Sequence, residues 1–204
     1  MRVSLRLRVA AAWTPEAALV GLVDRLARST LEALDALVAE HAPGGAAPRR
    51  DEATAPAGGL ELRRAAMASA QGARVRALVE ALGRERAVEA GREALYPVGV
   101  RLGEEARRAL GVGDGLGDLE RAARILYRAL GIDFTLERRE GGAMLMRVHR
   151  CALACRYSEE ACEVLSAADE GVVAGLSPGH RMRFERRMTG GPAECLARIE
   201  GAGA

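Results

Sequence analysis

Apolar and polar residues alternate over the first nine positions and then recur at helical spacing. Single Arg or Ser residues separate four apolar ones, which is the period of a half-buried strand, at Val3, Leu5, Leu7 and Val9. Thr14 can cap a helix whose first position is Pro15, where a missing N–H costs nothing. The pattern predicts a strand at residues 3–9 and a helix that runs to about His41.

The middle of the chain is helical in pattern but interrupted. Residues 42–59 mix Pro, Gly, Ala and charge without periodicity, as a loop or linker does. From residue 60 to about residue 94 the period is helical, with a break expected near Gly83 or Gly91 because glycine weakens a helix by roughly 1 kcal/mol. A shorter helix should follow Pro97. Another should begin after Asp114 or Asp118 and end at Gly131.

The last third returns to alternation. Residues 132–137 and 143–150 read as a hairpin, Ser158 caps a helix that reaches about Ala168, and short strands follow at 181–188 and 195–200. These elements predict an α+β fold, a helical N-terminal half followed by a β-β-α-β-β unit with an antiparallel or mixed sheet. The organisation expected is an N-terminal strand and helix (1–41), a loop (42–59) and one α+β domain (60–204).

Composition narrows the class of protein. A chain of 204 residues buries enough apolar surface to fold without disulfides, and it contains no run of roughly 20 apolar residues. Arginines interrupt the N-terminus where a signal peptide needs a continuous apolar region. We therefore expect a cytoplasmic protein with no membrane partner. The net charge is +2, all basic residues are Arg, and Arg alternates with Glu, so no nucleic-acid partner is expected.

The cysteines are the main candidates for chemistry. All four lie in the last 54 residues, at Cys151, Cys155, Cys162 and Cys195. In a reducing compartment such thiols are metal ligands or reactive groups more often than disulfides, and four thiolates suit zinc or an iron-sulfur cluster. The C-x3-C-x6-C spacing lacks the usual C-x2-C pair, and cysteine is also a small buried hydrophobe. Core, metal or cluster, and reactive thiol all remain open.

As a reactive thiol, Cys151 is the best candidate nucleophile because it begins the segment after the second hairpin strand. A nearby cation such as His149 or Arg150 would have to lower its pKa. His149 shares a strand face with Leu145 and Arg147, so a structural histidine is the competing interpretation.

Four segments resemble, in order, the landmarks of the 4-vinyl-reductase-like small-molecule-binding domain. They are GREALYPVGVRLGEEARRAL (91–110), GDLERAARILYRALGIDFTLE (117–137), CEVLSAADEGVVAGLSPG (162–179) and RFERRMTGGPAECLARIE (183–200). The related L-2-amino-thiazoline-4-carboxylate hydrolase family is similar to the C-terminal half of this pattern. The resemblance covers about residues 75–200.

The resemblance implies an apolar pocket, often with a metal near the C-terminal strands. Cys162, Glu185 and Cys195 fall at fitting ligand positions, while Met188 stands where a third cysteine is expected. A thioether is a poor zinc ligand, so Cys151, Cys155 or His149 would have to complete the site. The alternative is that Glu185 belongs to a surface ion-pair network with its neighbouring arginines, Arg183, Arg186 and Arg187.

Three functions follow from these observations. The first is a small-molecule-binding protein with a zinc or iron-sulfur centre and a pocket for a small apolar or cyclic ligand. The pocket is expected to be lined by Leu126, Ile132, Phe134, Met144, Met146 and Phe184. The second is a thiol- or metal-dependent hydrolase or reductase of a small cyclic substrate. The third is a structural or interaction protein, a homodimer held by residues 1–41, with its cysteines in the core.

Overall fold

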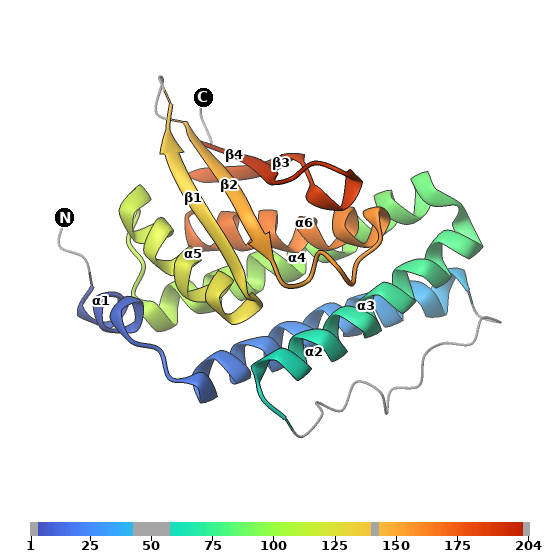
Figure 1. The fold of residues 1–204 in the computed structure, drawn as a ribbon, viewed down its shortest axis with the longest axis horizontal. Helices are drawn as coiled ribbons and strands as arrows, with labels where there is room; N and C mark the ends of the chain where they lie inside the picture. The colour runs from blue at the N-terminus through green and yellow to red at the C-terminus, as the bar shows by residue number, and fades with distance from the viewer. Residues whose placement is uncertain (1–3, 43–57, 140–142, 202–204) are drawn as a thin grey trace.

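The computed structural model describes residues 4–42, 58–139 and 143–201 (Figure 1). The described helices are α1 (Leu5–Ala12), α2 (Glu16–His41), α3 (Leu60–Leu82), α4 (Arg84–Leu110), α5 (Leu116–Leu130) and α6 (Glu159–Leu176), with a short 3-10 turn at Met188–Gly190. The strands are β1 (Ile132–Arg138), β2 (Met144–Cys151), β3 (His180–Arg186) and β4 (Cys195–Gly201). This order confirms the predicted α+β class and its β-β-α-β-β unit.

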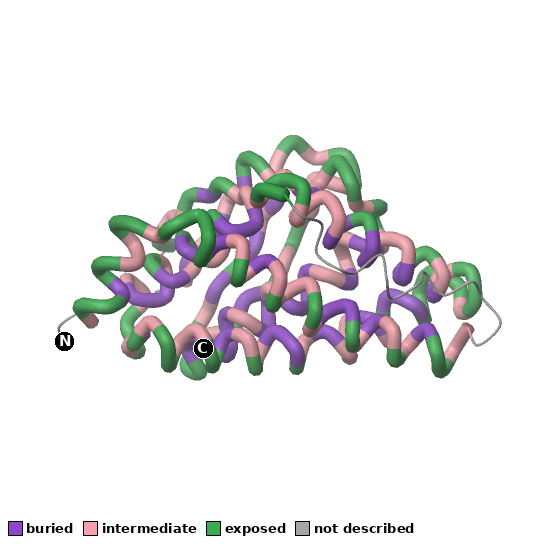
Figure 2. Tube along the Cα trace, turned by 90° about the horizontal axis from the view of Figure 1, so that it is seen from below, coloured by how far each residue is buried: buried purple, intermediate pink, exposed green. Residues whose placement is uncertain are grey.

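The four strands form one antiparallel sheet in the order β1-β2-β4-β3. One face of the sheet lies on the helices, and α6 and α4 run behind it in Figure 1. Burial alternates along β2, where Met144, Met146 and Val148 are buried and the residues between them are not. Buried positions likewise line the inner sides of the helices, while the outward turns are exposed (Figure 2).

The predicted N-terminal strand is wrong: residues 5–12 form helix α1. Leu and Arg are good helix formers, so the alternating pattern does not by itself exclude a helix. Leu7 is fully buried, and the Ser4 hydroxyl donates a hydrogen bond to the carbonyl of Leu110 at 3.2 Å. Packing on α4 and α5 therefore decides the conformation, and it leaves Leu5 and Val9 exposed.

The predicted break is confirmed at Gly83, which has a φ of 80° and separates α3 from α4. The shorter helix expected after Pro97 is wrong, because α4 continues through Pro97 to Leu110. Proline removes one hydrogen bond and normally kinks or ends a helix. Here the contact of α4 with α6, the most extensive between any two helices, holds the helix together.

Two helix ends differ from the prediction. Gly115, not Asp114 or Asp118, is the N-cap of α5, and the Asp118 carboxylate accepts a hydrogen bond from Gly113 N at 3.1 Å. Ser158 caps α6 as predicted, its hydroxyl accepting from Ala161 N at 3.2 Å. However, α6 ends at Leu176 rather than near residue 168.

Helices α4 and α6 touch through their backbones. Gly99 and Gly103 on α4 face Gly171 and Gly175 on α6. A Cβ at Gly99 would overlap the carbonyl oxygen of Ala168, and one at Gly171 would overlap that of Tyr96. Only glycine allows this approach, so the G-x3-G spacing in both helices fixes how they pack.

The predicted loop 42–59 falls mostly on residues 43–57, which lie outside the described part of the chain, so that boundary stays a prediction. Helix α2 runs along α3 and also contacts α4 and α5. A dimerisation role for residues 1–41 also stays a prediction. None of the helices in the described ranges is long and apolar enough to cross a bilayer.

Candidate ligand-binding site

An apolar cavity of about 760 Å³ lies among α1, α2, α4, α5 and α6. This volume lies inside the range of about 300–1,000 Å³ typical of small-molecule sites. An ion pair between Arg25 of α2 and Glu105 of α4, 3.3 Å long and largely exposed, stands at its wall. The apolar lining includes Trp13, Leu22, Leu26, Ala106, Leu126 and Val172.

A second, smaller cavity of about 80 Å³ adjoins the first, between α6, the sheet and α3. Residues from three helices line both cavities, so only their side chains separate the two spaces: Leu26, Tyr127, Leu130, Ala168 and Asp169. The smaller cavity also holds the thiols of Cys151, Cys162 and Cys195. The two cavities together form the candidate site.

Asp169 is the carboxyl group of this site. It lies on the side of α6 that carries Leu165, Val173 and Leu176, at helical spacing, where the other cavity-lining side chains are apolar or weakly polar. Burial and, to a smaller extent, the charge of neighbouring Glu170 raise the pKa of Asp169 to about 7, although Arg187 opposes the rise. Within the described ranges, no side chain or backbone N–H donates a hydrogen bond to this carboxyl group.

Other polar groups nearby fall into two sets. The amide of Gln71 donates to the hydroxyl of Thr30 at 2.7 Å and accepts from the hydroxyl of Tyr157, so these three satisfy one another. Tyr127 lines both cavities beside Asp169, and burial raises its pKa well above the usual value. Its ring packs edge-on against Phe134 at 5.3 Å. The phenol is therefore a neutral group held at the junction of the cavities.

The predicted nucleophile and its cation are not assembled. Burial raises the pKa of Cys151 to about 11, so this thiol is protonated at neutral pH. A β-bulge separates it from His149: Asp133 pairs with Arg150 and Phe134 with Val148, which leaves His149 as the extra residue. Cys151 consequently turns inward, whereas His149 stays on the outer face of the sheet.

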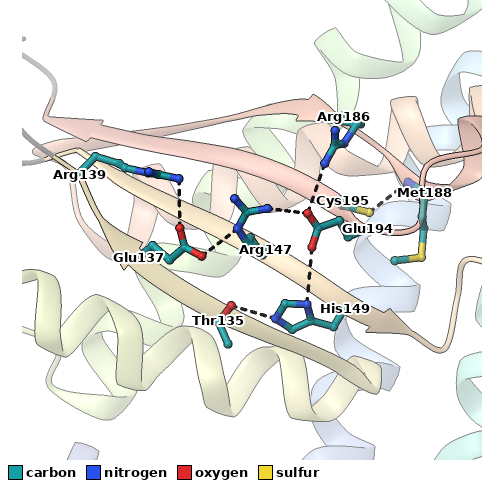
Figure 3. A network of polar contacts seen from close by, with 9 residues as sticks. All are labelled: Thr135, Glu137, Arg139, Arg147, His149, Arg186, Met188, Glu194 and Cys195. Atoms are coloured by element: carbon teal, nitrogen blue, oxygen red, sulfur yellow. Dashed lines mark hydrogen bonds and ion pairs between the residues drawn. The ribbon is translucent and has the colours of Figure 1, made fainter.

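His149 belongs to a network of polar contacts on that outer face (Figure 3). Its ring Nε2 lies 2.9 Å from the hydroxyl of Thr135, and its Nδ1 lies 3.7 Å from the carboxylate of Glu194. Glu194 also accepts from Arg147 at 2.6 Å and from Arg186 at 3.3 Å. This arrangement fits the structural interpretation of His149.

The predicted metal ligands come together only in part: Cys151, Cys162 and Cys195 line the small cavity, whereas Glu185, Cys155 and His149 lie elsewhere. Glu185 is exposed beside Arg138 and Arg198 on the outer side of the sheet, and Cys155 is exposed in the turn after β2. Met188 lines the smaller cavity, and its N–H donates to the Cys195 sulfur at 3.3 Å. Among residues 4–42, 58–139 and 143–201, no three His, Cys, Asp or Glu side chains are placed to hold a metal. The zinc or iron-sulfur centre therefore stays a prediction that the placement of these side chains does not support.

The predicted pocket residues divide between the cavities and the core. Leu126 lines the large cavity, and Ile132 and Phe184 line the small one. The other three, Phe134, Met144 and Met146, are buried core residues of the sheet. Sequence reasoning missed the cavity walls from α1 and α2, and it missed Asp169. A lone acid on the apolar stripe of α6 was the available signal for Asp169.

Comparison with known proteins gives a family and a fold. The family model described as L-2-amino-thiazoline-4-carboxylic acid hydrolase matches residues 63–198. No curated protein sequence gives a significant match. The trafficking protein particle complex subunit 3 from Naegleria fowleri, covalently bound to palmitic acid, is similar in structure with a TM-score of 0.57 and 12% identity, over 69% of this chain and 96% of that chain.

The phenol-responsive sensory domain of the transcription activator PoxR, with phenol, is also similar. Its TM-score is 0.51 at 18% identity, over 66% of this chain and 74% of that chain. At these identities the likeness concerns the fold alone.

Proposed function

We propose that this chain, which belongs to the L-2-amino-thiazoline-4-carboxylic acid hydrolase family, is a small-molecule-binding domain. The ligand occupies the apolar cavity of about 760 Å³ between the N-terminal helices and α4, α5 and α6. This cavity is the observation that carries the proposal, because it is lined mainly by apolar side chains and its volume is that of a small-molecule site.

The lining sets the chemistry of the ligand. Each methylene group moved from water into such a cavity contributes about 0.8 kcal/mol, so an apolar body of moderate size binds well and a highly polar one does not. The two proteins of similar fold are described with phenol and with palmitic acid, both largely apolar. The same class of ligand is proposed for this chain.

The test is direct titration with 1-octanol. Trp13, the one tryptophan of the chain, lines the cavity, so its fluorescence reports occupancy and calorimetry gives the affinity. Ala106→Phe places a ring in the cavity and should abolish binding. The matched control is Ala81→Phe on the exposed side of α3, which should bind as the parent protein does. If Ala106→Phe bound 1-octanol as tightly as the parent protein, the ligand would have to bind outside this cavity.

A hydrolase acting on a small cyclic substrate is the second candidate. The observation that favours it is the carboxyl group of Asp169, because an acid that lines a cavity and has a pKa of about 7 suits general acid-base catalysis. L-2-amino-thiazoline-4-carboxylic acid, the substrate in the family's description, is the first compound to try. Ring opening would appear in a mass spectrum as the gain of one water and should be lost in Asp169→Asn. No turnover by the parent protein would exclude this substrate.

A further inference from the structure

We propose that the ligand of the large cavity is an apolar amine, whose protonated amino group binds the carboxylate of Asp169 while its hydrocarbon part fills the space between α2, α4 and α5. This inference rests on the proposed function, and it names the chemical class that the site selects.

The position of Asp169 is the first argument. Its side chain lines both cavities, where the wide apolar space meets the narrow space beside the thiols. A ligand that fills the large cavity and ends at this junction would place its terminal group against the carboxyl group. Tyr127 lines the same junction and offers a hydroxyl that can accept a second hydrogen bond from an amino group.

The second argument is the contrast between two adjacent acids. Glu170 is paired: Arg92 lies 2.8 Å away, Arg187 lies 4.0 Å away, and Phe184 N donates to it. In the described ranges, Asp169 has neither an ion pair nor a hydrogen bond. Asp169 is half-buried and lines the cavities, and a carboxylate that has lost much of its hydration without gaining a partner is costly. We therefore expect this carboxyl group to gain its partner from the ligand.

Arg187, the cation whose charge acts on Asp169, is already engaged. Its guanidinium donates to the Ser166 hydroxyl at 2.8 Å and lies 5.4 Å from the centre of the Phe184 ring. It therefore leaves the charge of Asp169 to be balanced from the cavity side. A positively charged donor satisfies the carboxylate with a charge-assisted hydrogen bond, which is stronger than the bond a neutral alcohol can give.

The phenols and thiols around Asp169 do not titrate in the same range. Burial raises the pKa values of the neighbouring phenols and thiols above their usual values, so these groups stay neutral between pH 5 and pH 8: Tyr127 from α5, Tyr157 before α6, Cys151 from β2, Cys162 from α6 and Cys195 from β4. The charged side chains that line the two cavities besides Asp169 are Arg6 of α1, the Arg25 and Glu105 pair of α2 and α4, and Arg187 after β3. A change of affinity in this range therefore reports Asp169.

The experiment compares 1-octylamine with 1-octanol, which share an apolar body and differ in the terminal group. Affinities are measured by calorimetry and Trp13 fluorescence for the parent protein, for Asp169→Asn and for Asp133→Asn. Asp133 is an exposed carboxylate on β1 that pairs with Arg150 at 2.8 Å, so it is the matched control. We expect Asp169→Asn to weaken octylamine binding at pH 8 by at least about tenfold and to leave octanol binding unchanged. Asp133→Asn should change neither.

The parent protein alone gives a second readout, which does not depend on the folding of a variant. Because the carboxyl group has a pKa of about 7 in the free protein, octylamine should bind about 100-fold more weakly at pH 5 than at pH 8. Octanol affinity should stay nearly constant over the same range.

The outcomes separate the two proposals. Equal affinities for amine and alcohol, or a flat pH profile for the amine, would overturn the amine proposal and leave a neutral-ligand cavity in place. Failure of both compounds to bind would count against the proposed function itself. Loss of both affinities in a folded Asp169→Asn would also overturn the inference, because Asp169 would then maintain the cavity rather than select the amine.

Discussion

The two sides of helix α6 differ in how tightly they are packed. One side meets α4 with no space at all, since Gly171 and Gly175 lie against Gly99 and Gly103 and backbone touches backbone. The other side faces two cavities and carries Asp169 without a described partner. The closed side supplies packing, and the open side retains a feature that destabilises the empty protein. Such a feature is expected where a ligand binds.

The difference also explains why α4 tolerates Pro97. Dispersion contacts across a dry, backbone-to-backbone interface are numerous, and they compensate for the hydrogen bond that proline removes. The cavity side has fewer such contacts, so the position of α6 must be set by its closed side. The site therefore depends on residues that no ligand touches.

The largest effect on stability should come from adding a side chain where the backbones of α4 and α6 touch. Gly171→Val would force the backbones of α4 and α6 apart, because even its Cβ overlaps the carbonyl oxygen of Tyr96. We expect a loss of more than about 4 kcal/mol in the free energy of unfolding, or failure to fold. Urea denaturation followed by circular dichroism measures it.

The matched control is Gly21→Ala on α2, where an added Cβ meets nothing within 4 Å. This variant should gain about 1 kcal/mol through helix propensity. If Gly171→Val were as stable as the parent protein, the closed side of α6 would not be what positions the helix.

The next effect concerns the open side. A folded-state pKa raised to about 7 means that Asp169 contributes stability below its unfolded pKa of about 4, and that this stability is lost as the pH rises through 7. The amide of Asp169→Asn does not ionise, so this variant does not lose stability as the pH rises. We therefore expect the variant to be more stable than the parent protein at pH 8, by up to about 4 kcal/mol, and to differ little at pH 4. Denaturant titrations of both proteins at the two pH values test this, and equal stability at both would show that the carboxyl group is solvated.

The reactivity of the four thiols tests whether the small cavity on the open side of α6 is closed to solvent. Cys155 is exposed, whereas Cys151, Cys162 and Cys195 line the small cavity and burial raises their pKa values. At pH 7 a thiol reagent should modify one cysteine per chain quickly and the other three on the order of 100-fold more slowly. Cys155→Ser should abolish the fast phase. A fast phase that persists in Cys155→Ser would mean that the small cavity is open to solvent.

The smallest effect is expected on the outer face of the sheet. Glu194 contacts Arg147, Arg186 and His149 there (Figure 3), yet these side chains are partly exposed. Glu194→Gln should cost less than about 1 kcal/mol, and the cost should shrink at high salt. A loss above about 2 kcal/mol would show that this network supports the fold as much as the inner face does.

The strands after residue 131 were predictable, because one buried face imposes a period of two and the turns carry glycine. The same argument failed at residues 3–9, where helix formers alternate and packing of Leu7 decides the outcome. Pro97 misled for a similar reason, since only the contact with α6 keeps that helix continuous. The local sequence pattern therefore predicts most helices and strands, but it does not reveal the tertiary contacts that override it at residues 3–9 and at Pro97.

The candidate site was less predictable than the fold. Three of the four cysteines line the small cavity, but Cys155 is exposed in the turn after β2, and a bulge at His149 leaves Cys151 facing inward and His149 facing outward. The large cavity depends on how α1 and α2 lie against α5, which no periodicity encodes. Asp169 could have been found, since an acid at the centre of an apolar helical stripe is the pattern of a buried carboxyl group.

The most direct test of the central claim is a ¹³C NMR titration of the Asp169 carboxyl group, with and without 1-octylamine, assigned with Asp169→Asn. We predict a pKa of about 7 in the free protein and a value well below 7 in the complex, because a bound ammonium group favours the carboxylate. A pKa near the ordinary value of about 4 that the amine leaves unchanged would contradict the account. It would mean that Asp169 faces water and that the open side of α6 is not the binding site.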